Sequence, residues 1–143
     1  LFKVRSYVIV DGEYFYSDWS AEKTIDIPKL YGAEAWRWEA KRQLLAHGVY
    51  TKYRLDIIVN IIDHESGGSQ TAGQGRYYVG LMQFGAQWKH DYSKSYFAAH
   101  KITNFRTDNR LSGSWSLHRV AHLIKYGGGT DALKRHWPST GDL

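Results

Sequence analysis

The pattern of apolar and polar positions along the chain predicts three long helices. In each of them apolar residues recur at every third or fourth position, which places them on one face of a helix. Gly48 and Gly127 are placed to end two of these helices, and Thr51 is placed to cap the start of another. The predicted helices span residues 33–48, 51–65 and 111–129.

The apolar face of the helix predicted over residues 51–65 runs on to a glutamate. With Ile58 at the centre of that face and about 100° per residue, Glu65 lies about 20° from the centre and Asp63 lies on the opposite side. The other members of the apolar face are Leu55, Ile61 and Ile62. The sequence therefore predicts that Glu65 points inward.

The N-terminal residues are rich in β-branched and aromatic side chains, a composition typical of strands. Asp11 and Gly12 interrupt them and accept the positive φ angles of a tight hairpin turn. A connector that contains Pro28 follows. Because an isolated hairpin is only marginally stable, we expect residues 1–31 to form a hairpin and connector that pack on a main domain of residues 32–143.

Shorter elements are predicted between and after the long helices. Residues 66–78 are rich in glycine and are predicted to form a loop. Thr130 is expected to cap the last helix, which closes at Pro138. The short helices are expected over residues 79–88, 90–100 and 130–137. The predicted fold class is therefore α+β, mostly α.

Composition excludes several functions. The 143 residues carry a formal charge of +5, which suits a polyanionic partner. The basic residues are scattered, however, so nucleic-acid binding is not expected. The chain has no cysteine, which excludes disulfides, thiolate metal sites and cysteine nucleophiles. No apolar run approaches the roughly 18 residues of a membrane-spanning helix, so membrane insertion is not expected.

Two histidines invite a metal-binding interpretation. His118 and His122 stand four residues apart on one predicted helix, a spacing that lets two imidazoles share an ion. No His-Glu-x-x-His pattern accompanies them, and no carboxylate lies near them in the sequence. We interpret the pair as part of a solvated polar face, and we expect neither a metal nor a cofactor.

Glu65 is the first candidate for chemistry. Burial at the end of an apolar helix face disfavours the charged carboxylate and raises its pKa. A carboxylic acid that stays protonated near neutral pH can donate its proton to a glycosidic oxygen. The alternative is a structural glutamate that is held by hydrogen bonds or faces water.

Two short motifs frame the glycine-rich loop. Glu65-Ser66 precedes it, and Gly80-Leu81-Met82-Gln83 follows it. At this spacing, and after an apolar helix, the two motifs resemble the signature of the lytic transglycosylases and goose-type lysozymes, the SLT-domain family of the lysozyme superfamily. The resemblance covers about residues 53–137.

The resemblance implies a lysozyme-like fold with a catalytic Glu65 at a helix end, to which the N-terminal β-hairpin is added. In such an enzyme the glutamate protonates the oxygen of the MurNAc-GlcNAc β-1,4 bond of peptidoglycan. It then acts as a base on the sugar's own C6 hydroxyl, which yields a 1,6-anhydro-muropeptide. The residues expected to bind the glycan are Ser66, Gly80, Met82, Gln83, Tyr78 and His136.

The chain departs from the family pattern at three positions. Ser116 stands in place of a tyrosine, and His136 and Trp137 stand where tyrosine and asparagine are usual. His136 either replaces the family tyrosine in the site or lies on the surface.

Two alternatives to a lytic transglycosylase remain open. Most glycoside hydrolases use two carboxylates, and Asp91 or Asp108 could fold back to position a water, which would make the protein a hydrolytic muramidase. A lysozyme-like fold could also bind glycan without cutting it, because a fold alone does not establish a function.

The chain begins at Leu1 and shows no signal peptide. We therefore expect a domain of a larger polypeptide. The first expectation is a virion-associated phage lysin, in a tail or internal virion protein, and the second is a periplasmic or secreted bacterial enzyme. The expected partners are peptidoglycan glycan strands and the remainder of that polypeptide.

Overall fold

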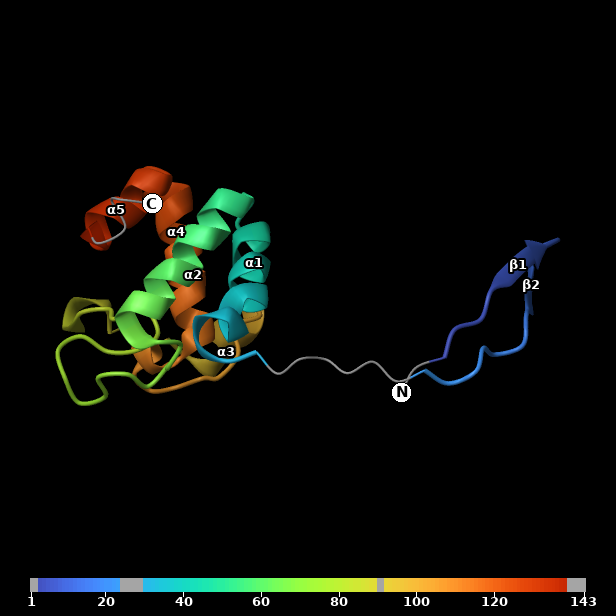
Figure 1. Cartoon of the computed structure of the whole chain (residues 1–143), viewed down its shortest axis with the longest axis horizontal. Helices are drawn as coiled ribbons and strands as arrows, with labels where there is room; N and C mark the ends of the chain where they lie inside the picture. Colours follow the sequence, from blue (N-terminus) through green and yellow to red (C-terminus); the bar gives the residue numbers. More distant parts are fainter. Residues whose placement is uncertain (1–2, 24–29, 90–91, 139–143) are drawn as a thin grey trace.

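The computed structural model describes residues 3–23, 30–89 and 92–138, which form a β-hairpin and a helical body (Figure 1). The hairpin consists of β1 (Tyr7–Val10) and β2 (Glu13–Tyr16). The α-helices are α1 (Arg37–Ala46), α2 (Lys52–Ser66), α3 (Lys94–Ala99), α4 (Gly113–Tyr126) and α5 (Thr130–His136). Short 3-10 turns lie at Gly32–Trp36, Ala86–Trp88 and Asn109–Leu111. The class is α+β with helices predominating, as the sequence predicts.

Helix α2 buries the face that the apolar pattern predicts. The side chain of Thr51 caps its start by accepting from the backbone N–H of Arg54, and Gly67 ends it with a φ of 58°. The exposed fraction is 5% or less for Leu55, Ile58, Ile61 and Ile62. The predicted face of this helix is therefore confirmed.

Helices α1 and α4 pack against each other and complete the core. Ser112 caps α4, and Gly127 follows its last residue as predicted. Gly113 lets the ring of Trp36 approach the backbone, because a Cβ at this position would lie 2.2 Å from that ring. The ring N–H of Trp36 in turn donates to the carbonyl of Gly68 at 2.8 Å, which ties the end of α2 to the start of α1.

The buried guanidinium of Arg110 holds two loops together. It donates to the backbone carbonyls of Tyr77 and Phe84 at 2.8 and 3.2 Å. Two of its nitrogens bind the carboxylate of Asp108. Gly80 lies in the turn between Tyr77 and Phe84, and its backbone is so close to the carbonyl of Arg110 that a Cβ would come within 1.8 Å of the oxygen.

The structure corrects the helix predicted over residues 79–88. This segment forms a turn followed by a single 3-10 turn at Ala86–Trp88. Gly80 and Gln83 have φ angles of 87° and 48°, and the left-handed region does not continue a right-handed helix. The apolar residues between them are fully buried because they belong to the core, so their pattern does not indicate a helix face.

The two other short helices are present. Helix α3 is capped by Ser93, while positions 90 and 91 of the predicted span lie outside the described residues. Helix α5 ends before Pro138 as predicted, but its N-cap is Gly129. The hydroxyl of Thr130 does not cap the helix and accepts from the guanidinium of Arg54 at 3.2 Å.

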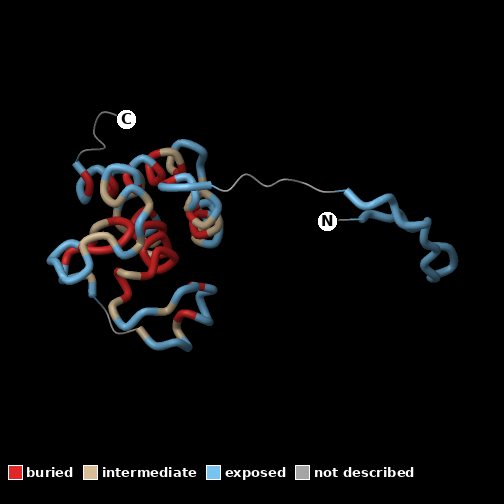
Figure 2. The backbone as a smooth tube through the Cα atoms, turned by 60° about the horizontal axis from the view of Figure 1, so that its bottom comes forward, coloured by how far each residue is buried: buried red, intermediate tan, exposed pale blue. Residues whose placement is uncertain are grey.

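The hairpin forms as predicted, with antiparallel strands and a turn at Asp11 and Gly12, which both have positive φ. Every residue from 3 to 23 is exposed (Figure 2). The structure therefore gives no support to the expectation that the hairpin packs on the main domain. Residues 24–29 of the predicted connector lie outside the described residues.

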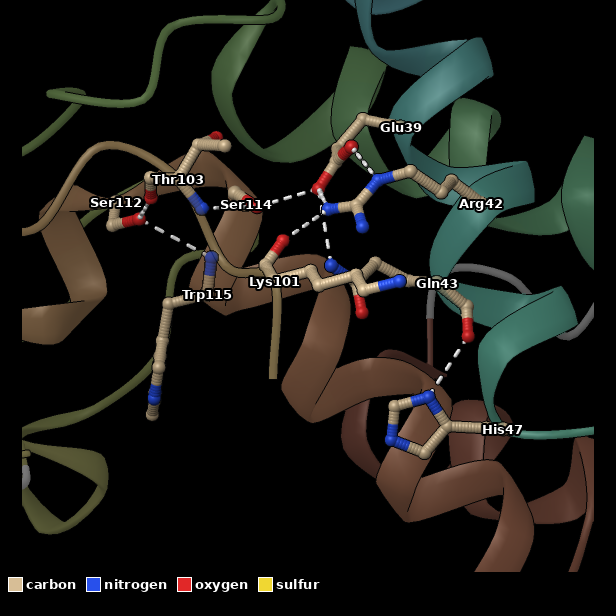
Figure 3. Close-up of polar contacts among 9 residues, drawn as sticks. All are labelled: Glu39, Arg42, Gln43, His47, Lys101, Thr103, Ser112, Ser114 and Trp115. Atoms are coloured by element: carbon tan, nitrogen blue, oxygen red, sulfur yellow. Dashed lines mark hydrogen bonds and ion pairs between the residues drawn. The ribbon is translucent and has the colours of Figure 1, made fainter. Parts of the chain in front are cut away.

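A polar network joins α1 to α4 and to the chain after α3 (Figure 3). The carboxylate of Glu39 accepts hydrogen bonds from Arg42, Gln43 and Ser114, and Arg42 also donates to the carbonyl of Lys101. Burial opposes the ionisation of Glu39, but these donors outweigh it and lower the pKa of the carboxyl. Glu39 is thus an ionised, structural carboxylate.

Substituting Gly80 by alanine is expected to destabilise the fold, with Gly75→Ala as a matched control. The two glycines have φ angles of 87° and 86°, so each substitution carries the same left-handed strain of about 1–2 kcal/mol. A Cβ at position 75 meets no atom within 4 Å, whereas a Cβ at position 80 meets the Arg110 carbonyl. We expect Gly80→Ala to lose roughly 1–3 kcal/mol more unfolding free energy in urea titrations. Equal losses for the two variants would contradict the close approach.

Candidate active site

Four of the predicted site residues line one cleft. Glu65, Tyr78, Gln83 and His136 surround a space of about 330 Å³ together with Trp137. Glu65 lies in the last turn of α2, Gln83 in the turn that follows the glycine-rich loop, and His136 at the end of α5. Glu65 is the one acid among these five lining residues.

Glu65 is partly buried, whereas Asp63 on the other side of α2 is exposed, as the helical spacing predicts. Burial raises the pKa of Glu65, and the neighbouring His64 opposes that shift in part. Among the described residues no hydrogen bond or ion pair holds its carboxyl group. A protonated Glu65 is therefore free to donate to a molecule in the cleft.

A somewhat larger cavity, of about 410 Å³, lies beside the polar face of α2 and contains Asp63 and Glu34. Glu34 is exposed and bound by the guanidinium of Arg37, whose hydrogen bonds lower the pKa of the Glu34 carboxyl. An ionised and paired carboxylate is a poor proton donor. This cavity is the larger of the two, but the raised pKa of Glu65, set against the lowered pKa of Glu34, makes the cleft at Glu65 the better candidate for acid catalysis.

Gln83 is held in place by its own turn. Its side-chain nitrogen donates to the carbonyls of Gly80 and Ala72, at 2.9 and 3.3 Å. These contacts use the amide nitrogen, which leaves the amide oxygen as the acceptor that Gln83 can offer to a ligand. The turn thus fixes a polar group on the wall of the cleft.

The end of α5 builds the opposite wall. The ring N–H of Trp137 donates to the backbone carbonyl of Met82 at 3.0 Å, and the indole packs against Phe84. His136 is exposed at the rim, with its ring 5.6 Å from that of Trp88. Desolvation of the His136 ring lowers its pKa, and the positive charge of Arg135 adds to this effect.

A second, smaller space of about 170 Å³ continues the cleft. It shares Tyr78, Gln83, His136 and Trp137 with the first and extends to Trp88 and Arg135. Tyr78 is exposed, and its ring packs edge-on against that of Tyr77. The cleft is thus a groove with Glu65 at one end and an aromatic and basic region at the other.

Three predicted site residues lie outside the lining of this groove. The hydroxyl of Ser66 donates to the carbonyl of Ile62 and accepts from the backbone N–H of Gly68, so it closes the end of α2. Met82 is fully buried in the core. Gly80 is buried and permits a close backbone approach, but to Arg110. These three residues thus stabilise the segments that carry the lining residues, and they do not line the groove themselves.

The second acids considered from the sequence do not join Glu65 in the described residues. Asp108 is bound by Arg110, and the hydrogen bonds from that guanidinium lower the pKa of the Asp108 carboxyl. It lines a separate cavity with Arg106. Asp91 lies outside the described residues.

His118 and His122 differ from the expected solvated face. His118 is 6% exposed, and its ring packs against those of His47 and His100. Within residues 3–23, 30–89 and 92–138, no three His, Asp or Glu side chains are grouped so that they could hold a metal ion. No helix in the same ranges has the length and apolar character needed to cross a membrane.

Trp137 and Arg110 are two contributors that the sequence did not reveal. In the sequence Trp137 is only a departure from the family pattern, yet its indole lines the cleft. Both residues act through contacts with distant parts of the chain, which a local pattern does not contain.

Comparisons of the chain with protein-family models, with curated proteins and with solved structures give no match.

Replacing Gln83 by glutamate is expected to loosen the turn, with Gln87→Glu as a matched control. A carboxylate at position 83 could not donate to the carbonyls of Gly80 and Ala72, whereas the oxygen of Gln87 accepts from the hydroxyl of Tyr77, and a carboxylate can do the same. At neutral pH we expect Gln83→Glu to lose about 1–3 kcal/mol of unfolding free energy. If thermal denaturation places the two variants at the same stability, the assigned hydrogen bonds of Gln83 are incorrect.

Proposed function

We propose that this protein is a peptidoglycan-degrading enzyme that cleaves the MurNAc-GlcNAc β-1,4 bond, with Glu65 as the catalytic acid. The observation that carries the proposal is a partly buried carboxyl group of raised pKa on the wall of an aromatic and polar groove. The motifs Glu65-Ser66 and Gly80-Leu81-Met82-Gln83 support the same assignment and a lysozyme-like fold.

The first step is a proton transfer from Glu65 to the glycosidic oxygen. The bond between that oxygen and the anomeric carbon of the MurNAc residue then breaks, and the developing positive charge spreads over the sugar ring. The Glu65 carboxylate produced by this step next accepts the proton of the C6 hydroxyl of the same MurNAc. The C6 oxygen bonds to the anomeric carbon and closes the 1,6-anhydro ring, which restores the protonated acid.

The single carboxylate of the groove favours transglycosylation over hydrolysis. Hydrolysis by an inverting mechanism needs a second carboxylate to activate water, and Glu65 is the one acid among the described lining residues. Transglycosylation needs no activated water because the nucleophile belongs to the substrate. Hydrolytic cleavage is the second candidate, and a non-catalytic glycan-binding module is the third.

The rest of the groove suits a peptidoglycan strand. The exposed ring of Tyr78 offers aromatic surface to the apolar faces of sugar rings, and Gln83 offers an amide to their polar substituents. Arg135 adds a cation at the far end of the groove, and the chain carries a formal charge of +5. Both features favour an anionic polymer. A virion-associated or extracytoplasmic location follows from such a substrate.

Glu65→Gln is expected to abolish the digestion of purified peptidoglycan while the protein stays folded. The amide keeps the shape of the side chain but has no proton to transfer. Asp63→Asn is the matched control, because Asp63 lies on the same turn of α2 but is exposed on the opposite side. Activity retained by Glu65→Gln, or lost equally in Asp63→Asn, would overturn the assignment of Glu65.

Mass spectrometry of the muropeptides released by the unaltered protein distinguishes the candidate reactions. Products lighter by one water than lysozyme products are expected from transglycosylation. Hydrated reducing ends would instead support the hydrolytic candidate. Binding to peptidoglycan without any release of muropeptides would support the non-catalytic module.

The pH dependence of digestion is expected to reflect Glu65. The group must be protonated to act as an acid, so activity is lost as the pH rises through its raised pKa. Because His64 partly lowers that pKa, His64→Gln is expected to move the alkaline limb of the pH–rate profile to higher pH. A limb that stays in place or moves to lower pH would contradict this electrostatic coupling.

A further inference from the structure

Four histidines meet at the corner where α1, α3 and α4 come together. The ring centroid of His118, on α4, lies 4.8 Å from that of His47 and 5.4 Å from that of His100, and His47 lies 6.4 Å from His122. His47 and His100 are the residues that follow the last turns of α1 and α3. Part of this cluster lines a cavity of about 300 Å³ that shares no residue with the groove at Glu65.

The partners of these rings differ. The Nδ1 atoms of His47 and His100 lie 2.8 and 2.9 Å from the backbone carbonyls of Gln43 and Tyr96. A carbonyl can only accept, so both Nδ1 atoms carry hydrogen; Figure 3 shows this contact for His47. The Nδ1 atom of His118 is buried and has no partner among the described residues.

A proton on His118 would meet no compensating charge. The charged groups that act on His118 are all basic, and the carboxylate of Glu39 on α1 is engaged by Arg42, Gln43 and Ser114. Burial lowers the pKa of His118 to about 4, and the neighbouring positive charges add to this effect. Titratable groups face the cluster from three places. His47 follows α1; Tyr96 lies on α3, and His100 and Lys101 follow that helix. Helix α4 contributes Arg119, His122 and Lys125.

The weakest of the three elements at this corner is α3. It has six residues, and a helix of this length is not stable without packing. Phe97 anchors it in the core, and the carbonyl of Lys101 is held by Arg42. Ile102 is also buried in the core, and a further attachment is the stack of rings that connects Tyr96 and His100 to His118.

We propose that residues 92–102, with α3 at their centre, form an acid-released flap, which detaches from α1 and α4 when His118 is protonated while α2 stays folded. The direction of the pH effect follows from the lowered pKa of His118 in the attached state. When the segment detaches, His118 is in water, where it binds a proton more readily, so acid favours the detached state. The flap is therefore held at pH values above the ordinary pKa of histidine and is released as the pH falls below it. This inference does not depend on the proposed enzymatic function.

Hydrogen-exchange mass spectrometry of the whole chain between pH 7 and pH 4, corrected for intrinsic exchange rates, tests the flap. His118 has a pKa of about 4 when attached and an ordinary value of 6.5 when solvated, so the opening constant of residues 94–100 is expected to rise roughly 20-fold from pH 7 to pH 5. Amides of α2 are expected to keep their protection. An unchanged α3, or a loss of protection in α2 in step with α3, would overturn the proposal.

Two variants of His118 separate its titration from its packing. His118→Phe keeps an aromatic ring in the buried position and removes the titrating group, so the opening constant of α3 is expected to change less than about 3-fold over the same pH range. If this variant does not fold, His118→Gln serves the same purpose. His64→Gln, which removes an exposed histidine on α2, is expected to keep the full pH dependence. Persistence of the pH dependence in a folded His118 variant would assign the effect to another group and overturn the proposal.

Discussion

The buried guanidinium of Arg110 is the contact on which the groove depends. It holds both ends of the turn between Tyr77 and Phe84, and Asp108 compensates its charge inside the protein. Gln83 and Tyr78 take their positions from that turn. Removing a charge from water is costly unless it is paired and hydrogen-bonded. The protein meets this condition with one carboxylate and two carbonyls, and the result is a rigid wall made from a segment that has no regular secondary structure.

Two partly buried glutamates show how the protein assigns opposite roles to one residue type. Glu39 accepts hydrogen bonds from three side chains, which outweigh burial and keep it ionised. Glu65 has burial without such donors, so its proton is retained to higher pH. The difference lies in the neighbours and not in the depth of the two side chains. A structural carboxylate and a candidate acid can therefore be distinguished by their donors.

Local patterns in the sequence predicted the elements whose determinants are local. The buried face of α2, its cap at Thr51 and the inward position of Glu65 follow from helical spacing and hydrogen-bonding chemistry within a few residues. The turn at Gln83 was missed because a positive φ at a non-glycine residue is imposed by contacts elsewhere. The roles of Arg110 and Trp137 were missed for the same reason, since the backbone carbonyls that they bind lie 26 to 55 positions away.

The groove also has a consequence for the order in which the molecule assembles. Its two walls come from the turn at Gln83 and from the end of α5, and Trp137 reaches Met82 across 55 positions of the chain. Contacts of large sequence separation form late, because closing a long loop costs entropy before any contact compensates for it. A chain in which α2 has formed but α5 has not yet docked lacks the wall of the groove that His136 and Trp137 provide. The groove around Glu65 is thus completed in the last stage of folding, when the C-terminal helix docks.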